Sequence, residues 1–274
     1  AERAGRKRVF NIWARPSRWW IALVRAMYPL SLLKLLHNRQ MALHDQAEPP
    51  APPLKAVETP ASIEGLVAAL GPDASVLGGG TDLQLRRRTN LHMPDRLVSV
   101  VKVAELKQLS VPETGPIVIG AGVTLSRLAA AIKARIPAVA DTIEEIASPQ
   151  IRNVATVAGN LRQEKRCWFF RNDFNCFKRR GGLAPCYAIE GDHRFYHAAI
   201  DGHRCQAVTP SDLATVLVAL DAMVTITSPD GVRDVALGAL YTGPGEMDGL
   251  GERDVITRIT IPAEAAARQT SFSK

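Results

Sequence analysis

The sequence predicts a globular protein whose fold mixes helices with strands. Short apolar runs of strand length alternate along the chain with amphipathic patterns of helical period. The chain has 274 residues, of which 46% are hydrophobic, enough to bury one large core or two modest ones. The alternation stops at about residue 162 and resumes at about residue 207. We therefore expect two regular regions with an irregular segment between them.

The expected elements follow from local patterns and from residues that begin or end helices. Strands are expected where short apolar runs are rich in β-branched residues, at 75–77, 97–101, 117–119, 224–227 and 255–261. Helices are expected where apolar residues recur every three or four positions, at 62–70, 104–109, 125–132, 138–147, 211–222 and 235–240. Ser211 is placed to cap its helix, and Ser228 to Gly231 have the composition of a turn. We find no internal repeat.

The positive charge of the chain is concentrated at its N-terminus. The formal net charge is +7, but residues 1–44 carry nine Lys and Arg against one acid, which leaves −1 for the rest. The main body is therefore close to neutral, and nucleic acid is not an expected partner.

Residues 1–45 are predicted to form a basic, amphipathic helical extension. Its apolar stretch from Trp19 to Leu36 contains Arg25, Pro29 and Lys34, so neither a membrane span nor a secretory signal is expected. Docking to a partner subunit, contact with a membrane surface and simple packing on the body all remain open. A chain that starts at Ala1 also suggests a fragment or a processed product. Residues 46–60 are Pro-rich and polar, which predicts an extended linker.

Two segments have the composition of phosphate-binding turns. The first is Val76 to Leu83, in which three glycines follow a strand, so that backbone N–H groups are accessible to an anion. It is neither a G-x-G-x-x-G motif nor a P-loop, and chain reversal alone would also explain it. The second is Arg152 to Leu161, with a hydroxyl, a glycine and an amide near one another. Two such turns could close on one dinucleotide.

All four cysteines of the chain lie within a stretch of 39 residues, at Cys167, Cys176, Cys186 and Cys205. Cysteines that served only as small core residues would not gather in this way, so a shared ligand or disulfides are indicated. Zinc sites usually contain a C-x2-4-C pair, which is missing here, and two disulfides would need an oxidising compartment. Iron–sulfur ligation needs four thiolates and tolerates wide spacing. These three alternatives remain open at this point.

Five short motifs occur in an order that resembles a known family. They are VLGGGTDL (76–83), ATVAGNL (155–161), PSDL (210–213), ITRITIP (256–262) and SFSK (271–274). Together they resemble the FAD domain of the xanthine dehydrogenase and aldehyde oxidoreductase family, over about residues 55–274. The resemblance implies an α+β fold of two FAD-binding lobes, of the PCMH type that is also called vanillyl-alcohol-oxidase-like. The lobes would span residues 61–161 and 207–274.

The resemblance also implies which residues bind FAD. The first glycine loop would wrap the pyrophosphate, and Thr156 and Asn160 would bind it from the second turn. Ile146 would form an apolar wall, Ile256 would pack near the ring, and Lys274 would approach the flavin end. The full implied set is Val76, Leu77, Gly78, Gly79, Gly80, Thr81, Asp82, Leu83, Ile146, Thr156, Gly159, Asn160, Asp212, Ile256 and Lys274. Asp212 could instead cap a helix, and Lys274 could belong to a solvated tail.

The sequence departs from the family pattern at two places. Ala158 stands where the family commonly has a second glycine, a mild change. Members usually continue for about 100 residues beyond the position of Lys274 into a third lobe, which we expect this chain to lack.

The cysteine segment, residues 162–206, resembles the insertion that carries a 4Fe-4S cluster in bacterial periplasmic aldehyde oxidoreductase flavin subunits. The resemblance implies that the four cysteines bind such a cluster. Its negative charge could be neutralised by Lys165, Arg166, Arg171, Lys178, Arg179 and Arg180. Gly181 and Gly182 would let backbone N–H groups approach the sulfurs, and the aromatic residues between 168 and 177 would exclude water. We expect His193, His197 and His203 to be structural, because four cysteines complete the ligand set.

The resemblance therefore implies an electron-transfer subunit of a molybdenum hydroxylase, with FAD and a 4Fe-4S cluster as cofactors and no catalytic acid or base. The implied partners are a molybdopterin-binding large subunit and a 2Fe-2S small subunit. The expected location is bacterial, either cytoplasmic or periplasmic by export with a partner. The alternative is a free-standing flavin oxidoreductase of the same fold that acts directly on its substrate.

Overall fold

The computed structural model describes most of the chain after the predicted linker. The described residues belong to one compact unit within residues 50–274 and are 53–88, 91, 94–172, 174–180, 184–189, 191, 193, 197–200, 202, 204–242 and 249–273. The helices predicted for residues 1–45 and the first part of the linker, residues 46–52, lie outside them. The same holds for Gly181, Gly182, His203 and Lys274.

A three-stranded parallel sheet comes first in the chain. Its strands are, in spatial order, β1 (Ala56–Glu58), β3 (Arg96–Ser99) and β2 (Ala74–Leu77). Parallel strands need long connections, and these contain α3 (Ile63–Ala69) and α4 (Leu83–Arg88). The strand expected at 75–77 is confirmed, and the one expected at 97–101 is confirmed as far as Ser99, where β3 ends. β1 lies inside the predicted linker. The sequence did not indicate this strand, because it forms by pairing with β3 and has no local apolar pattern.

A five-stranded antiparallel sheet follows. Its spatial order is β4 (Leu109–Ser110), β5 (Ile117–Gly120), β8 (Val255–Ile261), β6 (Met223–Ser228) and β7 (Gly231–Ala236). The sheet takes strands from both sides of the cysteine segment, so it does not follow the expected division into lobes at 61–161 and 207–274. The turn expected at 228–231 is confirmed as the hairpin between β6 and β7. The prediction of a helix at 235–240 is wrong for its first two residues, which pair with β6. Within that range, η2 (Leu237–Leu240) is helical.

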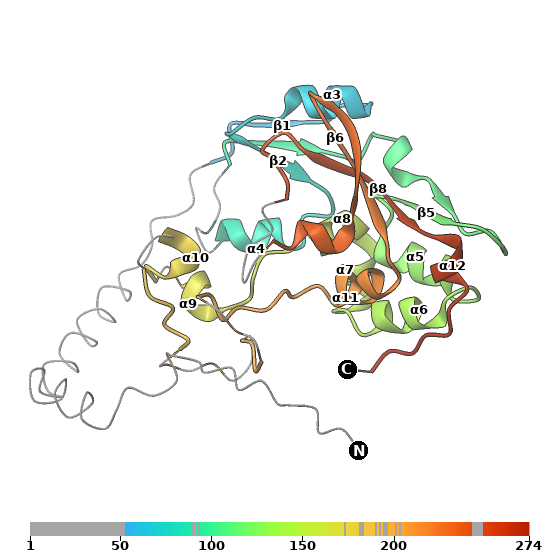
Figure 1. Ribbon diagram of the computed structural model, residues 1–274. Coiled ribbons are helices and arrows are strands. Elements are labelled where there is room, and N and C mark those ends of the chain that lie inside the picture. Colours follow the sequence, from blue (N-terminus) through green and yellow to red (C-terminus); the bar gives the residue numbers. More distant parts are fainter. Residues whose placement is uncertain are drawn as a thin grey trace, which may run out of the picture. The chain divides into compact units, whose positions relative to one another are not determined.

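Three helices pack together below the second sheet in Figure 1: α5 (Leu125–Ile132), α6 (Pro137–Glu144) and α11 (Asp212–Ala219). The helix expected at 125–132 is confirmed. The one expected at 138–147 ends early, because Ala147 takes a left-handed φ of +49°. The one expected at 104–109 is only η1 (Glu105–Lys107), because Leu109 pairs in β4. The other short helices are α7 (Pro149–Val154), α8 (Val157–Leu161), α9 (Trp168–Arg171), α10 (Phe177–Arg180) and α12 (Ala263–Ala266).

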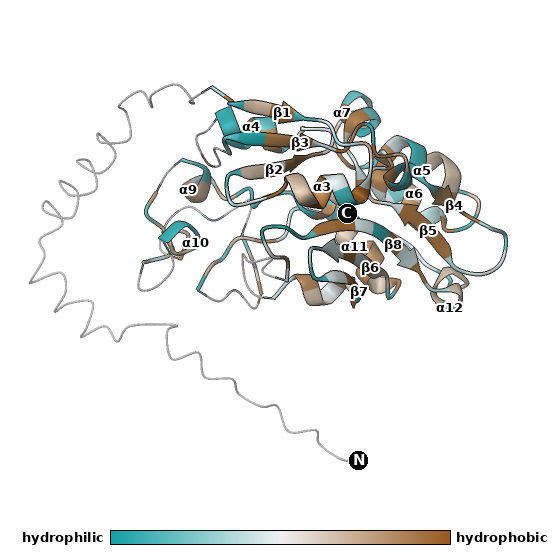
Figure 2. Cartoon of the chain, turned by 90° about the horizontal axis from the view of Figure 1, so that it is seen from above, coloured by the Kyte–Doolittle hydropathy of each residue, from teal (hydrophilic) through white to brown (hydrophobic). Residues whose placement is uncertain are grey.

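One apolar core joins both sheets to the helices. Leu66 of α3 and Val98 of β3 belong to the same buried cluster as Leu128 of α5 and Ile259 of β8. Figure 2 shows hydrophobic residues along β3 and β5, on the strands of either sheet. The two sheets therefore fold around a shared core. A second, small cluster forms around three of the cysteines, and its members are Cys167, Phe170, Cys176, Cys205 and Ala207.

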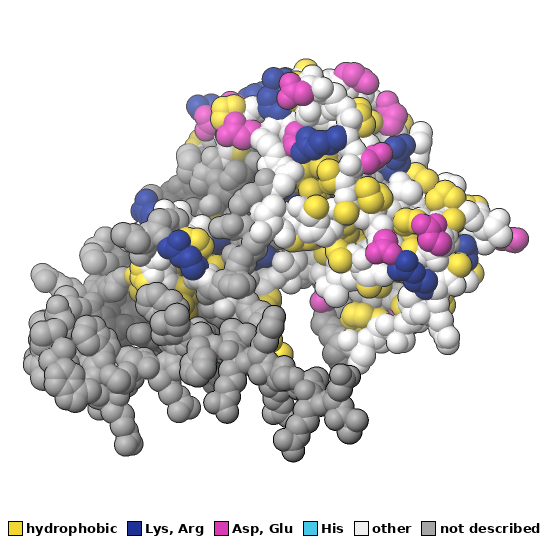
Figure 3. Space-filling view, viewed as in Figure 1, with side chains coloured by type: hydrophobic (Ala, Val, Ile, Leu, Met, Phe, Trp, Pro, Cys, Tyr) yellow, Lys and Arg dark blue, Asp and Glu magenta, His cyan; other side chains and the backbone are white. Residues whose placement is uncertain are grey.

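The surface of the described part mixes both signs of charge. Arg96 bridges Glu58 and Asp73 across the first sheet, and Lys55 pairs with Asp95. Figure 3 shows basic and acidic side chains interspersed on the face that it presents, without a basic stripe. Among the described helices, none is long and apolar enough to cross a bilayer.

Ser211 provides a test of how α11 is held. Its hydroxyl, which is buried, accepts the N–H of Ala214 at 3.0 Å and donates to Asn160 Oδ1 at 2.7 Å. Ser211→Ala removes the cap and leaves a buried amide oxygen unpaired, so we expect a loss of about 2 to 4 kcal/mol in urea unfolding. Ser126→Ala is the matched control, because the hydroxyl of Ser126 donates to Asn153 Oδ1 at the same 2.7 Å in an exposed setting. That variant should lose less than about 1 kcal/mol; equal losses would contradict the assignment.

Candidate functional site

The first glycine loop joins β2 to α4 and lies directly against a second segment of the chain. Gly80 has a φ of +73°, which favours glycine. A Cβ at Gly79 would overlap the carbonyl oxygen of Val154, and a Cβ at Gly78 would lie 2.7 Å from Thr156 Oγ1. The backbones approach too closely for side chains at these positions. The two segments that we expected to close on one dinucleotide are therefore in direct contact.

The second segment has a different local structure from the expected turn. α7 ends at Val154 and α8 begins at Val157, so Gly159 lies inside a helix and not in a turn. The physical reason is that Thr156 caps α8: its Oγ1 accepts the N–H of Gly159 at 3.2 Å. The hydroxyl and the glycine are within hydrogen-bonding distance, as expected, but they belong to the cap and first turn of a helix.

A cavity of about 560 Å³ opens beside this contact, a volume typical of small-molecule sites. The residues that were expected to bind FAD and that line it are Val76, Gly78, Gly79, Gly80, Thr81, Asp82, Leu83, Thr156, Gly159 and Ile256. Leu77, Ile146, Asn160 and Asp212 are not among its lining residues. Both glycine segments and strand β8 thus contribute to one concave surface.

The four residues that do not line the cavity have other places in the structure. Ile146 packs against the main core, and Asn160 is buried and accepts the hydroxyl of Ser211. Asp212 is the first residue of α11, directly after the cap, and Leu77 is the last residue of β2. Any role of these residues toward FAD, like that of Lys274, stays a prediction.

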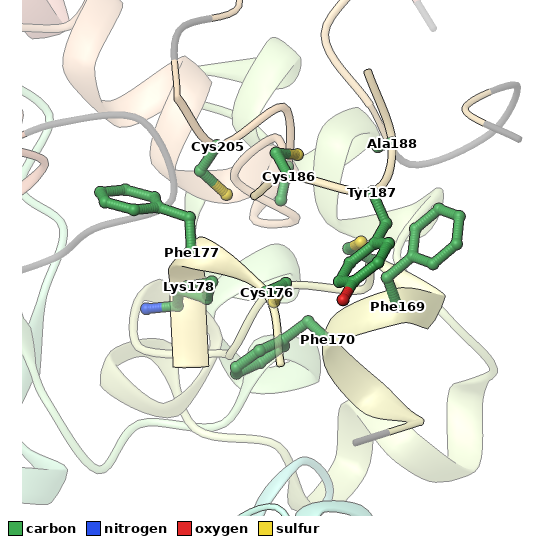
Figure 4. Close-up of a pocket in the computed structure, with 11 residues that line it drawn as sticks. Phe169, Phe170, Cys176, Phe177, Lys178, Cys186, Tyr187, Ala188 and Cys205 are labelled. Atoms are coloured by element: carbon green, nitrogen blue, oxygen red, sulfur yellow. The ribbon is translucent and has the colours of Figure 1, made fainter. Parts of the chain in front are cut away.

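The four cysteines line a second, much smaller void. Figure 4 shows Cys176, Cys186 and Cys205 around it, together with Phe169, Phe170, Phe177, Lys178 and Tyr187, and Cys167 completes the set. All four are free thiols, and three of them are buried while Cys186 is partly exposed. Residues that are up to 38 positions apart in the sequence are thus brought to one place.

The thiols have neighbours that act on their charge. Burial raises the pKa of Cys167 and Cys205, while backbone N–H groups of Phe170 and Phe169 oppose the shift at Cys167 and that of Ala207 opposes it at Cys205. Cys167 directly precedes α9, whose first turn supplies those two amides. His197 Nε2 lies 3.1 Å from Cys167 Sγ, so this histidine contacts a thiol, whereas His193 bonds the carbonyl of Gly191.

The void between the thiols is about 10 Å³, close to the size of one water molecule. Among the described residues, no group of three or more His, Cys, Asp or Glu side chains is arranged to hold a metal ion. The cysteines therefore share one void, but they are not set in the geometry of a metal centre.

The comparison with protein families identifies the domain that contains the glycine-lined cavity. Residues 53–264 match the family described as the FAD binding domain in molybdopterin dehydrogenase, which is well over half of the chain. The chain belongs to this family.

Two relatives of this FAD-binding domain are flavin subunits of oxidoreductases. The aldehyde oxidoreductase FAD-binding subunit PaoB of Escherichia coli strain K12 is 33% identical over 214 residues, covering 75% of this chain and 66% of PaoB. The xanthine dehydrogenase FAD-binding subunit of Escherichia coli O157:H7 is 28% identical over 178 residues, covering 64% of this chain and 46% of that subunit. The chain thus spans just under two thirds of the first relative and under half of the second.

Solved structures support the fold of the FAD-binding domain. Carbon monoxide dehydrogenase from Hydrogenophaga pseudoflava matches with a TM-score of 0.56 and 22% identity, over 77% of this chain and 60% of that one. Quinoline 2-oxidoreductase from Pseudomonas putida 86 matches with a TM-score of 0.55 and 22% identity, over 78% and 60%. The expected mixed helix and sheet fold is confirmed.

The FAD-binding domain has charged residues in its cavity that the sequence motifs did not indicate. Lys165 is only 5% exposed and donates from Nζ to Thr209 Oγ1 at 2.8 Å. Burial lowers the pKa of Lys165, and the charge of Lys178 lowers it further, so a bound anion would favour its charged form. Further basic lining residues are Arg86, Arg162 and Lys178. The sequence signal was misleading because Lys165 and Lys178 lie in the cysteine segment, where we assigned them to the cluster alone.

Gly79→Ala tests the close approach of the two glycine segments. The added methyl group would meet a backbone carbonyl, which cannot rotate away, so we expect a loss of stability of about 2 kcal/mol or more and at least tenfold weaker FAD binding. Gly238→Ala is the control, because its Cβ would lie 3.7 Å from Val218 Cγ1, an ordinary contact. Calorimetry and flavin fluorescence measure both effects. If Gly79→Ala bound FAD as tightly as Gly238→Ala, the contact would not shape the cavity.

Tyr241 gives a test that depends on pH. It lines the cavity and donates to the carbonyl of Leu161 at 3.1 Å, and burial raises its pKa to about 12 although Arg162 opposes the shift. An unfolded tyrosine ionises at about pH 10, so stability should fall as the pH rises from about 10 toward 12. At pH 11, native wild type and Tyr241→Phe should have equal phenolate absorbance at about 295 nm, and unfolding by urea should reveal a difference of one tyrosine. A difference before unfolding would show that Tyr241 is not buried as described.

Proposed function

We propose that this chain is an electron-transferring flavin and iron–sulfur subunit of a molybdenum hydroxylase. It would receive electrons from 2Fe-2S clusters of a small subunit and pass them through FAD to an acceptor. One observation carries the proposal: the glycine-lined cavity and the thiol void are adjacent, and the side chain of Lys178 lines both. Two redox groups in these places would be neighbours, as electron transfer between them requires.

FAD fits the larger cavity by its shape and by its charge. The strip at Gly78, Gly79 and Gly80 lines the cavity without side chains, which lets a phosphate approach its backbone N–H groups. Two acids of the lining already have cations outside the lining: Arg171 and Arg166 pair with Asp82, and Arg233 pairs with Asp254. We therefore assign the diphosphate of FAD to the glycine strip with the lining cations nearby. When bound, FAD supplies a carrier that takes up electrons singly or in pairs.

The donor set of the thiol void fits a 4Fe-4S cluster in number and in kind. Four free thiols converge on it, aromatic rings line it, and Lys178 and Lys165 lie near enough to offset negative charge. The present void holds about one water molecule, so binding of a cluster calls for the surrounding loops to move apart. When bound, the cluster supplies one-electron transfer, and this chain provides its ligands and a dry surrounding.

The partners and location are proposed from the relatives. PaoB and the xanthine dehydrogenase protein are named as FAD-binding subunits, that is, as parts of larger enzymes. We propose the same role here, with a molybdopterin-binding large subunit and a 2Fe-2S small subunit as partners. Substrate chemistry would then take place on the large subunit, in the cytoplasm or, after export of the assembled complex, in the periplasm.

Cofactor analysis of the full chain tests the proposal. Purified under iron-replete conditions, the chain should contain about one FAD and about four iron atoms with matching sulfide. Cys205→Ser should lose most of the iron while still taking up FAD at saturating concentration, because the thiol void lies outside the glycine strip. His193→Ala, which alters an exposed histidine, is the control and should keep both cofactors. Stoichiometric zinc without iron would overturn the cluster, and failure to bind FAD would overturn the flavin site. Co-purification with the two partner subunits tests the assembly.

A further inference from the structure

Asp82 ends the glycine loop, and its carboxylate binds the cysteine segment. Its Oδ2 accepts the backbone N–H of Glu164 at 3.0 Å, and its Oδ1 accepts Nη2 of Arg171 at 3.3 Å. These partners are 82 and 89 residues away in the sequence. Arg86 and Arg166 also approach the same carboxylate, at 3.4 and 3.6 Å. This carboxylate therefore holds the glycine loop against the cysteine segment.

Arg171 carries the connection on to the thiols. Its Nε donates to the carbonyl of Lys165 at 2.7 Å, and its Nη2 donates to the carbonyl of Glu164 at 3.0 Å. These two residues shortly precede Cys167, and Arg171 closes the single helical turn that begins after this cysteine. The guanidinium group therefore holds both ends of the turn that positions Cys167 and ties them to the glycine loop.

The pair is well placed to transmit a change in either site. The side chains of Asp82 and Arg171 are 12% and 11% exposed, so solvent screens their interaction weakly. By contrast, the ion pair between Lys133 and Glu144 is 64% and 54% exposed. A buried charge that loses its partner stays without compensation, so the glycine loop and the cysteine turn cannot separate at low cost.

We propose that Asp82 and Arg171 are positioning residues that couple the flavin cavity to the thiol void, so that filling one tightens binding in the other. The inference rests on the proposed function, because it needs both FAD and a cluster. Coupling between two sites is reciprocal, and its usual size is about 5- to 150-fold in affinity.

The test compares FAD affinity in the iron-loaded and iron-free forms of the full chain, by quenching of flavin fluorescence. The loaded wild type should bind FAD at least about fivefold more tightly than the iron-free form. Arg171→Met and Asp82→Asn should bring this ratio close to one, and Arg171→Lys should lower it in part, since lysine keeps the charge but not the forked geometry. Lys133→Met, which removes the exposed pair, should leave the ratio unchanged.

Two results would overturn the coupling while the proposed function stands: equal affinities in the two wild-type forms, or an unchanged ratio in Arg171→Met. If Arg171→Met and Asp82→Asn do not fold, Arg171→Lys decides, because an unchanged ratio there also excludes the pair as the link. Absence of FAD or iron from the wild type would instead overturn the proposed function.

Discussion

The contact between the glycine loop and the start of α8 is the constraint on which the rest of the site depends. Gly79 lies against the carbonyl of Val154 with no side chain between them. The segment around Val154 is in turn fixed to the body, because Leu125 donates its N–H to Ala155 and Val157 donates to Val123. The parallel sheet that carries the loop is thereby set at one place against the α5 region. The cavity wall forms at that place, and its shape follows from how closely the two backbones approach.

Much of the fold could be predicted from local sequence, where burial and periodicity agree. The helix from Leu125 to Ile132 was expected with its bounds from the helical spacing of its leucines and isoleucine, and the structure adds a cap at Thr124. β7 was missed because it is an exposed edge strand without an apolar pattern, so only its pairing with β6 defines it. Likewise β1 forms by pairing with β3, which lies about 40 residues later in the sequence. The composition of the second sheet could not be predicted, because it depends on which distant strands pair.

The functional site, like the fold, contains features that the sequence predicted and others that it could not predict. The four cysteines could be found from composition alone, since few other roles explain thiols gathered in one segment, whereas the glycine loop gained its meaning from the second segment and from the order of the motifs. Lys165, Arg162 and Tyr241 could not be assigned to the cavity, because nothing in the sequence says which basic or phenolic side chains face inward. Asn160 was expected at the cofactor, yet its side-chain oxygen accepts the hydroxyl of Ser211. The side chain of Asn160 thus has a part in the surrounding fold, while its role toward FAD stays a prediction.

Adjacent cavities also share their electrostatics. Lys178 lines both of them, lies 5.7 Å from the centre of the Phe170 ring, and is 3.6 Å from Glu164 Oε1. Its side chain is 19% exposed, so its charge is only weakly screened toward either cavity. Since reduction adds negative charge, a cation at this place favours the reduced form of any group in either cavity. Glu164 opposes that effect from within the flavin cavity. With FAD and a cluster bound as proposed, the charge of Lys178 would act on both redox groups in the same direction, whereas Glu164 faces the flavin cavity.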